Sequence, residues 1–274
     1  MPHSGERWPR SRFNLHVIPS NRMADSRVNK IRLDRLLMER GLAESREKAQ
    51  ALILAGQVLV DEQKVEKRGA AVSARAALRI RGEGCKYVSR AGLKLEGALD
   101  HFCIQVGGKL CLDVGASTGG FTDCLLQRGA AKVFAVDVGT NQLDWKLRHH
   151  PRVVVREKTN ARYLTLKQIG ALVALATMDV SFISSTLILP ALLEALEQGA
   201  DLLVLVKPQF EVGRKQVGKG GIVRDPRSHQ EAVTRVSHKL LELGFSQLAT
   251  VESVLPGASG NREYFVHAIW GKSV

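Results

Sequence analysis

Eleven residues, Asp113-Val-Gly-Ala-Ser-Thr-Gly-Gly-Phe-Thr-Asp123, decide how the larger part of this chain folds. They follow an apolar run that begins at Lys109 and they open a helical pattern, so they form the turn between a buried strand and a helix. Small residues in such a turn let the backbone approach a ligand closely. Doubly wound α/β folds bind ligands at the carboxyl ends of parallel strands. The stretch therefore predicts an α/β domain with a ligand site at its first turn.

Strand-like and helical patterns alternate through the rest of this domain. Buried strands are expected at 109–114, 132–137, 153–155, 172–179 and 201–207, and helices near 120–128, 141–148, 184–198 and 228–243. Pro190 should kink the third of these helices or start part of it. Two more strand-like runs, 247–255 and 263–270, follow. The pattern predicts the α/β class, with a seven-stranded, mostly parallel sheet, helices on both faces and a terminal antiparallel strand.

A smaller α+β unit is expected at residues 30–84. The spacing of Leu33, Leu36 and Leu37 predicts one helix, and Ser45 is suited to cap a second. Two strands complete this unit, at 58–60 and 78–80.

The remaining segments flank or join these two parts. Residues 1–29 are rich in Arg, Ser, Pro and Asn without periodicity, and we expect a disordered basic tail. Within it, residues 1–22 are either an upstream extension that is not translated or a weak basic arm. Residues 85–105 are expected to link the folded parts through an amphipathic helix, and the large domain then covers 106–274.

The charge of the chain favours a polyanionic partner. Its 274 residues carry a formal net charge of +13, and residues 1–100 hold 20 of the 40 Lys and Arg but only 12 of the 27 Asp and Glu. Such a field attracts nucleic acid through electrostatic steering and counterion release. A basic protein can also use its charge for solubility alone, so composition leaves both interpretations open.

Membrane and zinc-dependent classes are disfavoured. No stretch approaches the roughly 18 consecutive apolar residues of a membrane span, and the N-terminus lacks the apolar core of a secretory signal. The four cysteines form no C-x-x-C pair, and Cys111 and Cys124 lie in apolar patterns that suit small core residues. We expect a cytoplasmic protein with no metal site and no membrane partner.

Polar residues at the ends of successive strands mark a candidate cofactor site. Asp113 and Asp137 end the first two strands, and Asn160 follows the third. An acid at the position of Asp137 can accept hydrogen bonds from ribose hydroxyls, which NAD enzymes use as well. The loop lacks the G-x-G-x-x-G fingerprint of those enzymes, however, and its D-x-G opening resembles the first motif of adenosylmethionine-binding enzymes. That resemblance implies contacts of Asp113 with the cofactor ammonium and of Asn160 with the adenine. The expected cofactor-binding residues are Asp113, Gly115, Ser117, Thr118, Gly119, Gly120, Phe121, Asp137, Asn160 and Asp179.

A candidate catalytic set stands at the later strand ends. Asp179 ends the fourth strand, Lys207 ends the fifth and Glu263 begins the last. Because strands four and five end at one rim of the sheet, Asp179 and Lys207 should converge there. With Lys94 these residues match, in order, the Lys-Asp-Lys-Glu tetrad of heat-shock-type (FtsJ-like) ribose 2'-O-methyltransferases, and the place of Lys94 rests on that resemblance. Taken singly, each of the four is more often an ordinary solvated residue.

The chemistry of ribose methylation needs such a set. A ribose hydroxyl is a poor nucleophile and must lose its proton as the methyl group moves. A lysine can assist only as a neutral amine, which desolvation or a neighbouring cation favours, whereas the carboxylates hold the lysines in place and oppose that change. We expect Lys207 to deprotonate or orient the hydroxyl and the other three residues to orient it, with positioning the larger effect.

A second resemblance concerns RNA. The phrases Arg32-Leu33-Asp34-x-x-Leu37, Ser45-Arg46-x-x-Ala49 and Gly56-x-Val58-x-Val60-Asp61 resemble the alpha-L RNA-binding motif of a small-subunit ribosomal protein and of pseudouridine synthases. This implies that Arg32, Arg46 and Lys48 meet phosphates, which positions RNA without reading its sequence. Arg90 is a further candidate, as is a glycine-rich basic loop within 207–227. Its residues Arg214, Lys215 and Lys219 either close over RNA or belong to a plain mobile loop.

From residue 30 onward the chain resembles the TlyA (hemolysin A) family of ribosomal RNA 2'-O-methyltransferases. The phrases that carry the resemblance are Ser89-Arg-Ala-Gly-x-Lys94, the loop from Asp113 to Asp123, Asp179-Val-Ser-Phe-Ile183, Lys207-Pro-Gln-Phe-Glu211 and Gly220-Gly-Ile-Val-Arg224. It implies a class I Rossmann-like fold and S-adenosylmethionine-dependent methylation of cytidine ribose, with ribosomal RNA or ribosomal subunits as the partner and no protein partner. An inactive RNA-binding assembly factor and a membrane-acting cytolysin remain alternatives.

Overall fold

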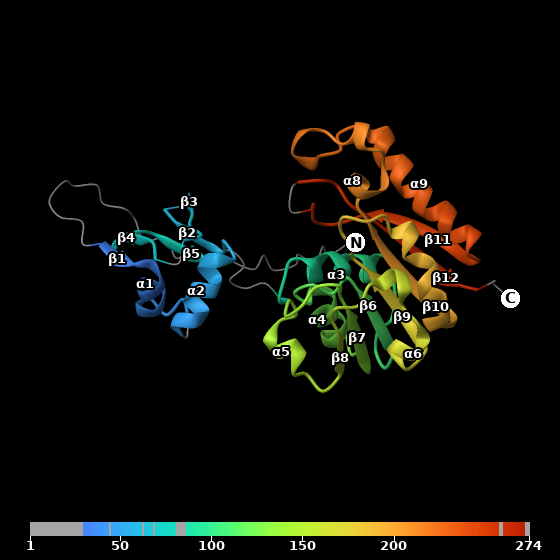
Figure 1. Cartoon of the computed structure of the whole chain (residues 1–274), viewed down its shortest axis with the longest axis horizontal. Coiled ribbons are helices and arrows are strands. Elements are labelled where there is room, and N and C mark those ends of the chain that lie inside the picture. The colour runs from blue at the N-terminus through green and yellow to red at the C-terminus, as the bar shows by residue number, and fades with distance from the viewer. Residues whose placement is uncertain are drawn as a thin grey trace, which may run out of the picture. The chain divides into compact units, whose positions relative to one another are not determined.

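The chain forms two compact units divided after Arg81 (Figure 1). The computed structural model describes residues 30–271 except Glu44, Glu62, Arg68, 81–85 and 258–259. The tail expected at 1–29 lies outside the described residues. In the part that is described, no helix has the length and apolar character needed to cross a membrane.

The first unit packs two helices against short strands. Its elements are β1 (Lys30–Arg32), α1 (Leu33–Glu39), α2 (Arg46–Leu54), β2 (Val58–Val60), β3 (Gln63–Lys64), β4 (Ala71–Ser73) and β5 (Leu78–Ile80). The expected helices and both expected strands are confirmed, and Ser45 caps α2 by accepting a hydrogen bond from the Lys48 N–H at 3.2 Å. The antiparallel pair of β1 and β4 was not foreseen, because the residues of these strands are exposed or half-buried and form no apolar run like that of β2.

The second unit is built on a seven-stranded sheet in the order β11-β12-β10-β9-β6-β7-β8. Its strands are β6 (Leu110–Val114), β7 (Lys132–Val136), β8 (Val153–Arg156), β9 (Val173–Met178), β10 (Leu196–Val206), β11 (Phe245–Glu252) and β12 (Tyr264–Trp270). Along the sheet, the neighbouring strands β10, β9, β6, β7 and β8 all pair in parallel. Strand β12 is antiparallel to both of its neighbours, β10 and β11. The predicted fold class is confirmed.

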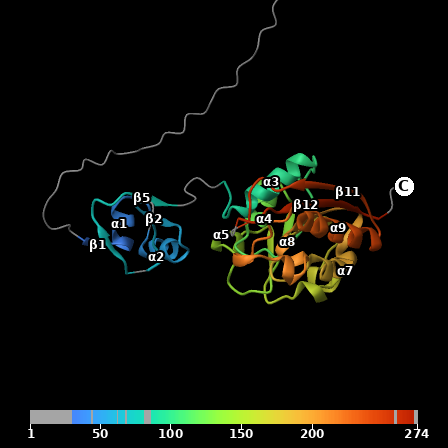
Figure 2. The same ribbon diagram turned by 90° about the horizontal axis from the view of Figure 1, so that it is seen from above.

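Helices cover both faces of this sheet because its strands are apolar on both sides. In β10, Leu202, Val204 and Val206 belong to one core cluster and Leu203 and Leu205 to the other. The first face packs against α6 (Leu166–Ile169), α7 (Leu189–Leu192) and α9 (Pro226–Glu242), and the second against α3 (Ala91–His101), α4 (Gly120–Gln127) and α5 (Trp145–Arg148). Figure 2 shows α3 on one side of β11 and β12 and α7 and α9 on the other.

Two segments differ from the expectation. The single helix expected at 184–198 is wrong: a 3₁₀ turn (Ser185–Leu187), α7 and a second 3₁₀ turn (Leu193–Ala195) replace it, and β10 already begins at Leu196. Pro190 lies in the first turn of α7, where backbone N–H groups have no acceptor within the helix, so proline removes no helical hydrogen bond. The helix expected in the linker is α3, which packs against α4 inside the second unit. An apolar run by itself does not separate a helix from a buried strand, and it does not reveal its packing partner.

Candidate active site

A cavity of about 500 Å³ opens at the carboxyl ends of four parallel strands of the second unit. Gly115 and Ser117 line it after β6, Asp137 after β7, Asn160 after β8 and Asp179 after β9. These ends meet at one edge of the sheet, where doubly wound folds bind ligands. The structure thus brings half of the expected cofactor-binding residues to one wall.

The wall beneath the cavity depends on a close contact between two backbones. A Cβ atom at Gly115 would lie 2.3 Å from the carbonyl oxygen of Asp179, and the φ angle of Gly115 is +85°. Both observations require glycine at this position. The turn after β6 therefore passes directly against the end of β9, which places Asp179 beside the turn.

The side chain of Asp137 connects the turn after β6 with the turn after β7. Its Oδ2 accepts a hydrogen bond from the Ser117 N–H at 2.8 Å, and its Oδ1 accepts one from the Gly139 N–H at 2.7 Å. A carboxylate has about four lone-pair sites, so Asp137 can accept further hydrogen bonds from a ligand. Its position on the cavity wall suits the hydroxyls of a ribose.

Asp113 takes a different place from the one expected. Its side chain is fully buried and does not line the cavity. The Thr122 hydroxyl donates to it at 2.7 Å and the Thr177 hydroxyl at 3.3 Å, which joins β6 to α4 and β9. Burial raises the pKa of Asp113 to about 7, opposed by the hydrogen bond from Thr122 and assisted by the charge of Asp179. The structure therefore places this carboxylate in contacts inside the fold, away from the cavity wall.

Four residues of the glycine-rich turn also stay away from the cavity wall: Thr118, Gly119, Gly120 and Phe121. The chain turns into α4 after Ser117, with Gly119 as the N-cap residue at a φ angle of +97°. Phe121 is buried and stacks on Phe265, with 6.0 Å between the ring centroids. These residues shape the turn and attach it to the core.

The structure brings the expected catalytic residues together as two ion pairs. The Lys94 Nζ lies 2.6 Å from the Glu263 Oε2, and both side chains are buried. The Lys207 Nζ lies 2.6 Å from the Asp179 Oδ1, and it also donates to the Ser181 hydroxyl at 2.9 Å.

The strand register places these two pairs side by side. Val206 of β10 is the partner of Tyr264 of β12, so Lys207 and Glu263 adjoin where the two strands end. Asp179 belongs to the second ion pair and also lines the cavity. A ligand in the cavity therefore lies next to the lysine–carboxylate set.

A buried glutamate joins the loops that carry Asp179 and Lys207. Glu211 ends α8 (Pro208–Glu211), directly after Lys207. Its carboxylate accepts hydrogen bonds from the Ser184 hydroxyl at 2.5 Å, the Ser185 N–H at 2.8 Å and the Ser185 hydroxyl at 2.7 Å. Glu211 ends the phrase Lys207-Pro-Gln-Phe-Glu211, but no local pattern indicates its role, because its partners lie in a distant segment.

Phe182 is a second residue that the sequence analysis missed. Its side chain is 91% exposed at the cavity rim, with its ring centroid 5.3 Å from that of Phe210. Its φ angle is +65°, a left-handed conformation that is strained for a bulky side chain. Residues with a strained backbone conformation of this kind cluster at functional sites. The only signal in the sequence was the phrase from Asp179 to Ile183.

The expected RNA-binding residues lie in both units. In the first, Arg32 and Arg46 both contact Asp34, and Lys48 is exposed on α2. In the second, Arg90 donates to the Pro256 carbonyl oxygen at 3.0 Å, in the loop that leads to Glu263. In the loop between α8 and α9, the three basic residues expected to contact RNA are exposed: Arg214, Lys215 and Lys219.

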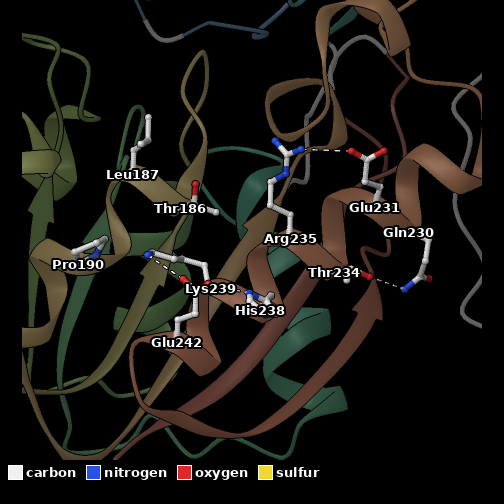
Figure 3. A pocket seen from close by; sticks show the side chains of 10 residues that line it. All are labelled: Thr186, Leu187, Pro190, Gln230, Glu231, Thr234, Arg235, His238, Lys239 and Glu242. Atoms are coloured by element: carbon white, nitrogen blue, oxygen red, sulfur yellow. Dashed lines mark hydrogen bonds and ion pairs between the residues drawn. The ribbon is translucent and has the colours of Figure 1, made fainter.

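A larger cavity of about 780 Å³ lies along α9 (Figure 3). Its charged side chains pair with each other, as Arg235 does with Glu231 and Lys239 with Glu242. It contains none of the tetrad and none of the turns after β6, β7 and β8. The smaller cavity is therefore the better candidate for the active site.

Comparisons with known proteins agree with this placement. Residues 87–270 match the family model of the FtsJ-like methyltransferases, and residues 31–75 match that of the S4 domain. The chain is 50% identical over 240 residues to the 16S/23S rRNA (cytidine-2'-O)-methyltransferase TlyA of Mycobacterium tuberculosis, covering 87% of this chain and 90% of that protein. It is 43% identical to hemolysin A of Brachyspira hyodysenteriae, covering 87% and 100%. A solved Streptococcus thermophilus structure, described as that of a hemolysin, superposes with a TM-score of 0.69 at 43% identity and 90% coverage of both chains.

Proposed function

Because this chain belongs to the FtsJ-like methyltransferase family, we propose that it transfers the methyl group of S-adenosylmethionine to the 2'-hydroxyl of a cytidine ribose in ribosomal RNA. The observation that carries the proposal is that Asp179 belongs both to the cavity wall and to the ion pair with Lys207. The name of the Mycobacterium tuberculosis relative supplies the cytidine and the ribosomal RNA. Such an enzyme works in the cytoplasm, beside its ribosomal substrate.

The cavity suits the cofactor in size and in chemistry. Its volume of about 500 Å³ lies within the range of roughly 300–1,000 Å³ for small-molecule sites. Asp137 would hold the ribose hydroxyls and Asn160 the adenine edge, against an apolar wall that includes Val136 and Ile188. When bound, S-adenosylmethionine supplies an electrophilic methyl group.

The chain's own residues would position the ribose hydroxyl. Lys207 carries three N–H donors, one of which the Ser181 hydroxyl accepts, and its ammonium group forms an ion pair with Asp179. A remaining N–H can hold the 2'-oxygen of the ribose, while Lys94, fixed by Glu263, adds positive charge nearby. The ion pair with Asp179 fixes the Lys207 side chain in place, so the geometry supports a role in orienting the hydroxyl. Aligned reactants can gain about 7–11 kcal/mol in this way.

Phe182 offers a surface for the target base. In a single-stranded RNA target, the base beside the reacting ribose can be splayed out of its stack and placed on an aromatic side chain. The exposed ring of Phe182 at the rim can stack on the released base, which is worth about 1–3 kcal/mol. This use of the ring would explain why a strained aromatic residue stands at the rim.

The test is methyl transfer from labelled S-adenosylmethionine to unmodified bacterial ribosomal subunits, followed by mapping of 2'-O-methyl sites. We expect Lys207→Ala to lower the rate by about 100-fold or more, because the hydroxyl loses its orienting group. Lys239→Ala is the control, since Lys239 pairs with Glu242 on α9, outside the candidate site. If the wild-type protein binds the cofactor but transfers no methyl group to subunits or free ribosomal RNA, the inactive assembly factor becomes the better interpretation.

A further inference from the structure

One buried carboxylate organises the cationic side chains of the first unit. Asp34 lies in α1 and is fully buried. Arg32 donates to both of its oxygens, from Nε at 3.0 Å and from Nη2 at 2.8 Å. From α2, the Arg46 Nε donates at 3.2 Å and the Gln50 Nε2 at 2.9 Å, both to Oδ2. A single acid therefore holds side chains from β1 and α2.

The two arginines remain available to an anion. Their side chains are 49% and 58% exposed, although each directs part of its guanidinium group to Asp34. A guanidinium has five N–H donors in a rigid plane, so a group fixed on one side can still bind phosphate on the other. Long side chains lose conformational entropy when they bind, and side chains that are already ordered lose less.

The negative charge of Asp34 makes it possible to distinguish two roles of this residue in RNA binding. Arg32 holds the pKa of this carboxyl well below its usual range, so the group is ionised at neutral pH. If Asp34 acts only through its negative charge, it repels the polyanion, and its removal should strengthen binding. If Asp34 instead orders the two arginines, its removal should weaken binding. The two roles predict opposite signs for the same substitution.

We propose that Asp34 is a positioning residue for RNA, which holds Arg32 and Arg46 in the arrangement that meets the phosphates. The inference rests on the proposed RNA substrate and goes beyond it, because it assigns an acid to the RNA-binding surface. Its physical basis is the shared carboxylate: two side chains from different elements acquire one fixed separation.

The affinity test compares two substitutions that each remove one negative charge from α1 of the full-length protein. Asp34→Asn removes the shared carboxylate, whereas Glu39→Gln removes an exposed carboxylate that pairs only with Arg35, at 2.8 Å, among the contacts of the described residues. We expect Asp34→Asn to weaken binding to unmodified ribosomal subunits by about 10-fold, because two side chains must be ordered anew. Glu39→Gln should leave the affinity unchanged or raise it.

A second measurement covers the case in which Asp34→Asn unfolds the unit. In the wild-type protein, NMR relaxation of the arginine Nε–H groups should show Arg32 and Arg46 to be more rigid than the exposed Arg75. Equal mobility of all three would overturn the proposal without any variant. So would a folded Asp34→Asn protein, with the core signal of Ile53 unchanged, that binds subunits as tightly as wild type or more tightly. If the wild-type protein binds no ribosomal subunit at all, it is the proposed function that fails.

Discussion

Asp113 is the residue at which burial and charge conflict most strongly. Its pKa is about 7 in the folded chain, against an ordinary value of 3.8. Between these two pH values the folded state binds more protons than the unfolded state, so the free energy of unfolding falls as the pH rises through this window. Above pH 7 the loss amounts to something on the order of 4 kcal/mol. The contacts with Thr122 and Thr177 keep this acid in place despite that cost.

Asp113→Asn should remove this pH dependence, because an amide can replace the carboxyl between the two threonines without titrating. We expect the melting temperature of the variant, relative to wild type, to increase from pH 5 to about pH 7 and then to level off toward pH 8. Thermal unfolding monitored by circular dichroism measures this difference, with a substitution of the exposed Glu194, Glu194→Gln, as the control. A difference that does not change with pH would show that Asp113 does not titrate in this range.

At the scale of elements, the site depends on how the loop after β9 is fixed to the helix after β10. Glu211 makes this connection through Ser184 and Ser185, and the same two segments carry Asp179 and Lys207. Strands β9 and β10 by themselves do not set the distance between the loop after β9 and the segment after β10. The buried glutamate therefore stabilises the spacing of the ion pair as well as the local fold.

We expect Glu211→Ala to lower both the melting temperature and kcat, because it leaves the buried N–H and hydroxyl of Ser185 without an acceptor. Each unsatisfied group costs about 1–3 kcal/mol. Glu211→Gln keeps one acceptor and should lie between the alanine variant and wild type. Glu231→Ala, on α9, is the matched control because its partners Arg235 and Gln216 are both exposed. Wild-type stability and kcat in Glu211→Ala would contradict this role.

At the scale of the whole molecule, the two units have separate apolar cores. The core of the first contains Leu33, Leu37 and Ile53, and it shares no residue with the two clusters that flank the large sheet. A small domain buries a smaller fraction of its surface than a large one and is correspondingly less stable. The first unit should therefore unfold at the lower temperature.

Calorimetry of the full chain should show two transitions, of which S-adenosylmethionine shifts only the upper one. A ligand at 100 times its Kd stabilises the unit that binds it by about 2.7 kcal/mol. The cavity belongs entirely to the second unit, so the first transition should not move. A single transition that moves as a whole would mean that the units unfold together.

The sequence by itself determined the α/β class, the main strands and helices, and the order of the tetrad along the chain. The class and the elements follow from local periodicity, and Asp179, Lys207 and Glu263 were found as polar residues at strand ends, which needs no knowledge of packing partners. The place of Lys94 came from the resemblance to a family. The parallel arrangement of β6, β7 and β9 then placed the strand ends at one edge, as doubly wound sheets do.

Only the tertiary structure decided which side chains reach the cavity and which lie beneath it. Asp113 lies near the end of the apolar strand β6 and Asp137 directly follows β7, yet the first is buried against α4 and the second lines the wall. The partners of Glu211 and of Asp34 likewise lie in other elements. Burial and pairing depend on what packs against a residue from distant parts of the chain, and no local pattern contains that information.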